Sequence, residues 1–235
     1  MLPALLVGIV AVAYWIKIHP TGGVVASDES ADTLLARGMK AHGAGAYDQA
    51  LELYRKTLER DPANAFAHYN IAQILNEQGR YAEAQIEYRA AVKAKPDFVD
   101  AQVNLGVAQY REKRFAEAAE TFRDALRLSP RHAQALFDLG ITLYELGDTD
   151  QAVARLNDSL RENPKFAQAH YYLGLAHERA QRPAEARAAL EQAVALDPKH
   201  AQAYFELVKV YRALGDDARA RDAEAKAAGL AGQRK

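Results

Sequence analysis

Prolines recur at a constant interval along this chain. Five of its eight prolines are separated by 34 residues each, at Pro62, Pro96, Pro130, Pro164 and Pro198. A single period of this length indicates a repeat architecture, in which each unit packs mainly against its neighbours. We therefore expect a stack of similar units rather than one central core.

Small and bulky residues keep the same period. Small residues recur at Gly38, Ala72, Gly106, Gly140 and Gly174, and alanine recurs at Ala50, Ala84, Ala118, Ala152, Ala186 and Ala220. Bulky apolar residues recur at Tyr54, Tyr88, Phe122, Leu156 and Leu190. Since small side chains let helix axes approach closely, each unit is expected to contain two tightly packed helices.

The residues within one unit favour a helix, a turn and a second helix. Residues 101–112 place apolar side chains at helical spacing, and residues 116–128 place Ala118 and Phe122 on one helical face. Each proline ends the second helix, because the residue before a proline is disfavoured in helical conformation. We predict helices near 65–78 and 82–95, with equivalents displaced by multiples of 34 residues, and no β-strand.

These repeating residues resemble the tetratricopeptide repeat (TPR) family. The unit 133–166 carries the residues typical of that family at Leu136, Leu139, Gly140, Leu143, Ala152, Leu156, Ser159 and Pro164. The resemblance covers six units, 31–64, 65–98, 99–132, 133–166, 167–200 and 201–234. It implies an all-α, right-handed superhelical solenoid of six helix–turn–helix repeats. The sixth unit has Val208, Glu224 and Gly232 where glycine, a bulky residue and proline are usual, so it is interpreted as a polar cap.

An apolar segment precedes the repeats. Residues 2–18 carry no charged side chain before Lys17, and as a helix they would span roughly 25 Å, slightly less than a hydrocarbon core of about 30 Å. We interpret residues 1–19 as a single-pass membrane anchor and residues 20–30 as a linker. A cleaved secretory signal peptide and a buried core helix are the alternatives. The basic residues that follow the segment favour a cytoplasmic repeat domain. Short N-terminal anchors, however, more often precede exported domains. Whether the repeats are cytoplasmic or periplasmic therefore stays open.

Composition argues against several functional classes. Lys plus Arg number 30 against 31 for Asp plus Glu, so no basic excess favours nucleic acid. Cysteine is absent, which removes thiolate catalysis and cysteine-ligated metals. His177 is not followed by a second histidine four residues later, and no phosphate-binding glycine loop occurs. We therefore predict no enzyme activity, no cofactor, no metal and no small-molecule substrate, with an enzyme of unknown type as the remaining alternative.

The family resemblance also implies a protein-binding groove on the first helix of each unit. Carried over by position, the groove residues are Tyr69, Val103, Tyr110, Arg111, Phe137, Tyr144, Tyr171, Glu178, Arg179 and Phe205. Large rings dominate many protein interfaces, although some of these rings could instead pack between helices. The carboxylate clamp of chaperone-binding family members is incomplete, because Asp100, Val103 and Asp138 stand where basic residues are needed.

The sequence thus predicts a membrane-tethered scaffold or adaptor that binds protein segments in an aromatic-lined concave groove. A permanent structural subunit of a membrane complex is the principal alternative. A secreted TPR protein, released by signal cleavage, is a further one.

Overall fold

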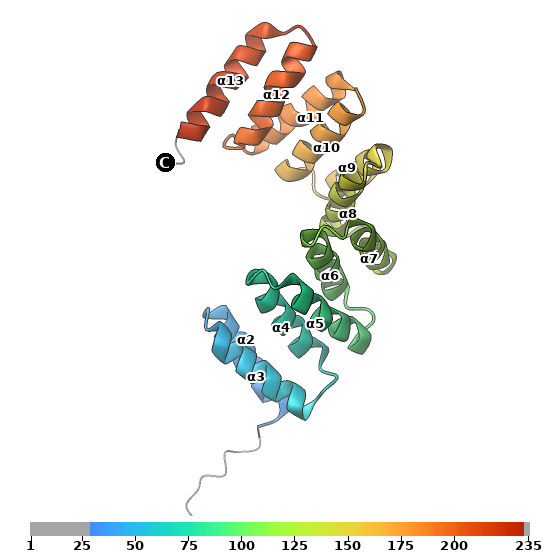
Figure 1. Cartoon of the computed structure of the whole chain (residues 1–235), viewed down its shortest axis with the longest axis vertical. Helices are drawn as coiled ribbons and strands as arrows, with labels where there is room; N and C mark the ends of the chain where they lie inside the picture. Colours follow the sequence, from blue (N-terminus) through green and yellow to red (C-terminus); the bar gives the residue numbers. More distant parts are fainter. Residues whose placement is uncertain (1–28, 233–235) are drawn as a thin grey trace, which may run out of the picture. The chain divides into compact units, whose positions relative to one another are not determined.

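The computed structural model describes residues 29–232, and all regular structure within them is α-helical (Figure 1). The predicted anchor at 1–19 and most of the predicted linker lie outside the described residues. None of the helices between residues 29 and 232 combines the length and apolar character needed to cross a bilayer. The described helices are α2 (Ala31–Gly43), α3 (Tyr47–Arg60), α4 (Ala65–Glu77), α5 (Tyr81–Ala94), α6 (Val99–Arg111), α7 (Phe115–Leu128), α8 (Ala133–Leu146), α9 (Thr149–Glu162), α10 (Ala167–Arg179), α11 (Pro183–Leu196), α12 (Ala201–Ala213) and α13 (Asp217–Gly232).

These bounds confirm the predicted alternation of helices and the expected absence of strands from residues 29–232. The residues that precede the prolines leave the helical region, as expected: Asp61, Lys95 and Ser129 have φ of −135°, −137° and −136°. Each of them still donates its backbone N–H to the carbonyl four residues earlier, which closes the last helical turn. The proline therefore fixes where the second helix of a pair ends.

The turn inside each helix pair needs a residue with positive φ. Glycine supplies it in four pairs, with φ between 74° at Gly45 and 84° at Gly147. Lys113 and Gln181 occupy the equivalent place in two other pairs, with φ of 60° and 57°. The backbone conformation thus repeats even where the glycine does not.

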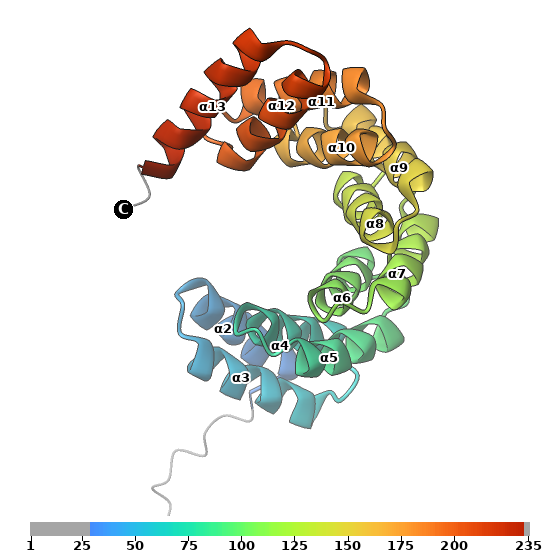
Figure 2. The same ribbon diagram turned by 45° about the horizontal axis from the view of Figure 1, so that its top comes forward.

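The described residues divide into two compact units. Residues 29–62 belong to the first unit, which contains α2 and α3, and residues 63–232 belong to the second unit, which contains α4 to α13. Within the second unit, each helix packs on the helices that precede and follow it. The first helices of successive pairs also contact one another, α6 with α8, α8 with α10, and α10 with α12 (Figure 2). These helices therefore form a continuous wall.

Close approach inside a pair depends on the periodic small residues. A Cβ atom added to Gly106 would lie 2.6 Å from Cε1 of Phe122, and one added to Gly174 would lie 2.5 Å from Cγ of Leu190. Both distances are shorter than any normal contact, so only glycine fits opposite these bulky residues. In the first unit, Gly38 and Tyr54 are related in the same way, at 2.5 Å.

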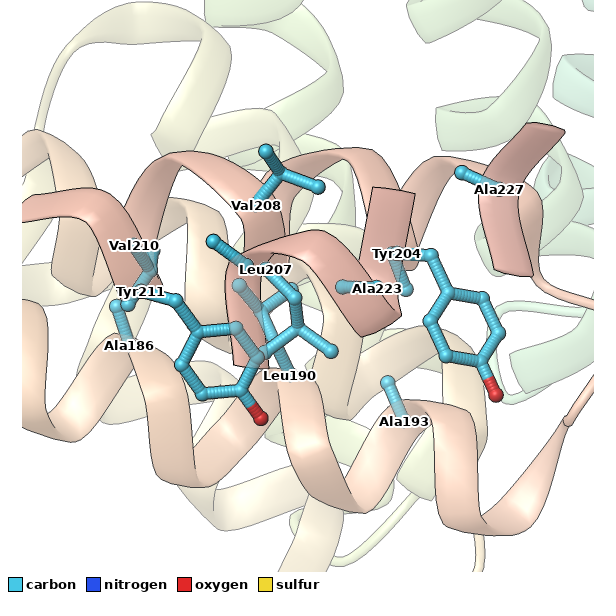
Figure 3. Packing of buried hydrophobic residues seen from close by; sticks show 12 residues of the cluster. Ala186, Leu190, Ala193, Tyr204, Leu207, Val208, Val210, Tyr211, Ala223 and Ala227 are labelled. Carbon is cyan, nitrogen blue, oxygen red and sulfur yellow. The ribbon is translucent and has the colours of Figure 1, made fainter. Parts of the chain in front are cut away.

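The last helix pair, α12 and α13, has a valine in place of the periodic glycine. Val208 on α12 is only 8% exposed and replaces the glycine, while the buried side chains of α13 are all alanines, at Ala220, Ala223 and Ala227. Figure 3 shows alanines arranged around Leu190 and Leu207 in this cluster. The pairs with that glycine carry a bulky buried residue 16 positions after it, whereas this pair has Glu224 there, with a side chain that is 59% exposed, which leaves room for Val208. The outer face of α13 is charged, and Glu224 accepts a hydrogen bond from Arg212 at 2.9 Å.

Candidate functional site

All ten predicted groove residues lie on first helices of the second unit. The structure places Tyr69 on α4, Val103, Tyr110 and Arg111 on α6, Phe137 and Tyr144 on α8, Tyr171, Glu178 and Arg179 on α10, and Phe205 on α12. The wall formed by these helices brings α6, α8, α10 and α12 together. The exposure of these residues and the hollows beside them differ along the wall.

Two of the predicted groove residues are packing residues. Val103 is 4% exposed and Phe137 is 6% exposed, and each belongs to a buried apolar cluster. The Phe137 ring lies 4.6 Å from the ring of Phe166, which precedes α10. The alternative of packing between helices therefore applies to these two positions, which present little surface. By contrast, Phe205 in the same register is 48% exposed.

A first hollow lies between α6, α8 and α10. Its volume is about 320 Å³, and the residues that line it are Val107, Tyr110, Arg111, Phe122, Gln134, Phe137, Asp138, Ile141, Gln168 and Tyr172. Tyr172 supplies one wall, with its ring 5.8 Å from that of Phe137. Tyr172 and Gln168 were not among the groove residues predicted from the sequence. The signal for Tyr172 was its register, since it lies 34 residues after Asp138.

A second hollow, of about 460 Å³, shares Gln168 and Tyr172 with the first. Its other lining residues are Tyr171, Asp197, Lys199, His200 and Gln202. The rings of Tyr171 and His200 lie 4.6 Å apart. His200 also caps α12, because its Nδ1 accepts the backbone N–H of Ala203 at 3.3 Å. This side chain therefore has a structural role besides facing the hollow.

A third hollow, of about 500 Å³, shares Tyr171 with the second and is lined by Tyr144, Leu175, Glu178, Arg179, Glu206 and Lys209. The Arg179 guanidinium lies 3.5 Å from the centre of the Tyr144 ring. Lys209 donates to Glu206 at 2.6 Å. Burial, together with the nearby Glu206 carboxylate, raises the pKa of Glu178. This hollow thus presents both signs of charge beside aromatic rings.

The phenol groups of Tyr110 and Tyr171 are neutral near neutral pH. Burial raises the pKa of Tyr110 and of Tyr171 to about 12 in each case. Their hydroxyl groups are therefore protonated near neutral pH and can donate hydrogen bonds to a ligand. Tyr69 is engaged within the protein, because its hydroxyl oxygen accepts from Gln73 and from Asn104, each at 3.0 Å.

One carboxyl in the first hollow is unusually placed. Asp138 is 6% exposed, and its Oδ1 accepts the Gln134 amide at 3.0 Å. Its other oxygen, Oδ2, is buried and has no hydrogen-bond partner. Burial raises the pKa of Asp138 to about 7, although the Gln134 amide and the Arg111 guanidinium act in the opposite direction.

The described residues of the hollows offer a ligand non-covalent contacts. Within residues 29–232, no group of three or more His, Asp or Glu side chains could hold a metal ion. The predictions of no enzyme activity, no cofactor and no small-molecule substrate remain predictions. Ring faces, phenol donors and paired charges are the recognition chemistry that the hollows present.

The comparison with protein families matches the tetratricopeptide repeat model at residues 35–97, 77–133, 137–199 and 177–234. The chain belongs to the tetratricopeptide repeat family. The family resemblance expected from the sequence is thereby confirmed for the repeats. No curated protein matches the chain.

Solved structures of other proteins share this fold. PilW, described as a widely conserved type IV pilus biogenesis factor, is 26% identical with a TM-score of 0.73, and the match covers 83% of this chain and 91% of PilW. YrrB, described as a TPR protein with an unusual peptide-binding site, is 22% identical with a TM-score of 0.67 over 76% of this chain and 91% of YrrB. MamA from Desulfovibrio magneticus RS-1 is 23% identical with a TM-score of 0.68 over 73% of this chain and 97% of MamA.

Proposed function

We propose that this TPR protein is a membrane-tethered scaffold that docks a segment of a partner protein along α6, α8, α10 and α12. The observation that carries the proposal is the continuity of the three hollows. The first and second share Tyr172, and the second and third share Tyr171. The Tyr171 and Tyr172 rings lie 5.4 Å apart, so the hollows meet at an aromatic junction.

An elongated ligand suits this surface better than a compact one. The hollows succeed one another across several helices, so a single small molecule would fill only one of them. Aromatic side chains contribute large contact areas at low entropy cost and often act as interface hot spots. The peptide-binding site described for YrrB, a structural neighbour, supports a segment of protein as the ligand.

Tethering is the second part of the proposal. It rests on the apolar run at residues 2–18, which contains no charged side chain before Lys17. Tethering would hold the scaffold near membrane-embedded or membrane-attached partners and raise their effective concentration. Cleavage of the same segment as a signal peptide is the alternative that N-terminal sequencing distinguishes.

A permanent structural subunit of a membrane complex remains the second candidate. The observation that favours it is the exposure of apolar side chains on second helices, such as Ile86 on α5 at 64% and Leu128 on α7 at 47%. A permanent subunit would bury these residues and co-purify at fixed stoichiometry. A scaffold for passing partners would give substoichiometric recovery that depends on the tyrosines of the hollows.

The test uses the full tagged chain, extracted in mild detergent, and quantifies the proteins that remain bound by mass spectrometry. Truncation of a central ring removes a hot spot, typically worth about 2 kcal/mol or more. Tyr144→Ala and Tyr171→Ala should therefore lower partner recovery more than tenfold. The control is Arg123→Ala on α7, which removes only a surface ion pair with Glu120.

Thermal melting of each variant accompanies the recovery measurement, since a ring that stabilises the fold would also lower the melting temperature. Unchanged recovery by both folded tyrosine variants would refute docking in the hollows. For tethering, full-length protein with an intact N-terminus in the soluble fraction would refute the anchor.

A further inference from the structure

The first hollow contains a carboxyl whose surroundings do not satisfy it. Asp138 lies on α8 with 6% of its surface exposed, and its Oδ2 atom is buried without a hydrogen-bond partner. A buried carboxylate that lacks a partner is destabilising, because its desolvation is not offset. A further positively charged group in this hollow would stabilise the carboxylate, as the Arg111 guanidinium that lines the hollow already does in part.

The partner that Asp138 does have is weak and replaceable. Oδ1 accepts a hydrogen bond from the neutral side-chain amide of Gln134 at 3.0 Å. Gln134 is an exposed residue that lines the same hollow. A charged donor adds to the hydrogen bond a charge–charge attraction that the neutral amide lacks. A cationic group that entered from solvent would therefore displace the Gln134 amide.

The walls of the hollow suit a cation on a long apolar stem. Tyr110, Phe137 and Tyr172 contribute rings, and the volume is about 320 Å³. Ring faces attract Lys and Arg side chains, and the methylene stem gains apolar contact. The third hollow already contains one such pair, because Arg179 lies over the ring of Tyr144.

We propose that the first hollow binds one basic side chain, arginine or lysine, of the docked protein segment, with Asp138 as its anion. This inference rests on the proposed docking function and specifies one subsite of it. The carboxylate of Asp138 disfavours an acidic side chain, although Arg111 in the same lining acts in the opposite direction. An apolar side chain would give the carboxylate no additional partner. The subsite therefore selects segments that carry a positive charge at one position.

Other charged groups around the hollow bear on its pH dependence. Arg111 and Tyr110 face it from α6, Tyr172 faces it from α10, and Glu145 on α8 acts on both phenols. Since burial raises the pKa of Asp138 to about 7, a cation must displace a proton below that pH. Binding of a basic group should thus weaken up to about tenfold for each pH unit below about 7.

The experiment uses the full chain in detergent micelles with ¹³C-labelled isoleucine methyl groups. Ile141 lines the first hollow and reports on binding, whereas Ile86 on α5 is the internal control. The probes are N-acetyl-arginine amide and N-acetyl-lysine amide, and N-acetyl-norleucine amide is the neutral comparison. At about pH 8, we expect at least one basic probe to shift Ile141 saturably, with an affinity at least tenfold above that of the norleucine probe.

Two variants test the role of the carboxyl. Asp138→Asn should weaken the basic probe at least tenfold, while the matched charge change Asp100→Asn at an exposed site of α6 should leave binding unchanged. Asp138→Asn removes a buried charge, so it should fold, and its melting temperature is measured alongside. Gln134→Ala removes the competing amide and should strengthen binding of the basic probe.

Equal affinities for basic and norleucine probes, no shift of Ile141, or binding that Asp138→Asn leaves unchanged would each overturn the subsite. The outcome is separate from that of the proposed function. If the basic probes fail while Tyr144→Ala and Tyr171→Ala still lose the partner, the subsite is refuted and docking stands. If the probes bind through Asp138 while both tyrosine variants retain the partner, docking along the hollows is refuted.

Discussion

Replacement of Asp138 by asparagine should make the protein more stable near neutral pH. The pKa of this carboxyl is raised from 3.8 to about 7 by burial. The unfolded chain therefore releases the proton at lower pH than the folded one. Between these two values the folded state binds more protons at Asp138, so the contribution of this carboxyl to stability is highest at low pH and falls as the pH rises toward 7.

The magnitude follows from the size of the shift. A gap of roughly 3 units at about 1.4 kcal/mol per unit corresponds to about 4 kcal/mol between pH 4 and pH 8. Asp138→Asn keeps the shape of the side chain and removes the ionisation. The variant should thus match the wild type near pH 4 and exceed its unfolding free energy by up to about 4 kcal/mol near pH 8.

Urea unfolding followed by circular dichroism measures this difference across the pH range. The control is Asp100→Asn, which changes charge on α6 at a side chain that is 67% exposed. That variant should follow the pH profile of the wild type. Parallel profiles for the wild type and Asp138→Asn would refute the argument, because the carboxyl would then titrate alike in the folded and unfolded states.

Three further outcomes are expected. Gly106→Ala should destabilise by about 1–3 kcal/mol in urea unfolding, because the new Cβ would lie 2.6 Å from the Phe122 ring, whereas Gly229→Ala, with open space around it, should not destabilise. Lys113→Gly should raise the melting temperature, since a φ of 60° costs an L-residue about 1–2 kcal/mol, and an unchanged or lower value would contradict that assignment. Deletion of residues 1–26 should leave the helical circular dichroism signal intact and move the protein from the membrane to the soluble fraction.

The helices were predictable because their determinants are local and repeated. The predicted helix 65–78 is observed at 65–77, and the predicted helix 82–95 at 81–94. Proline at a fixed place ends a helix whatever its neighbours are, so the period defines the ends. The periodic glycine was a weaker signal for the turn between the two helices, because Lys113 adopts the same positive φ in a pair that lacks the glycine.

The surface of the wall was only partly predictable. Phe137 and Tyr171 have the same register, yet Phe137 is buried against Phe166 and lines one hollow, while Tyr171 lines two. Which ring is covered depends on the side chains of the next helix, and position within one repeat does not contain that information. Tyr69 is another case, since Asn104 from the following repeat occupies its hydroxyl.

The most informative groups of the first hollow lie one residue beyond the register chosen from the sequence. Asp138 and Tyr172 follow Phe137 and Tyr171 directly and repeat at the same interval as Asn70 and Asn104. Register alone does not distinguish a buried carboxyl from a solvated one. The burial of Asp138 depends on α6 and α10, which pack against α8 from both sides.

The proposed scaffold docks a partner segment along the hollows of α6, α8, α10 and α12. The most direct measurement is site-specific photo-crosslinking of the full chain in its native membrane, with a photoreactive phenylalanine analogue at position 171 or, as the control, at position 123. Docking in the hollows predicts a discrete crosslinked partner from position 171 and none from position 123. The yield of the crosslink from position 171 should fall in the Tyr144→Ala variant. The same partner from position 123 alone would contradict docking in the hollows.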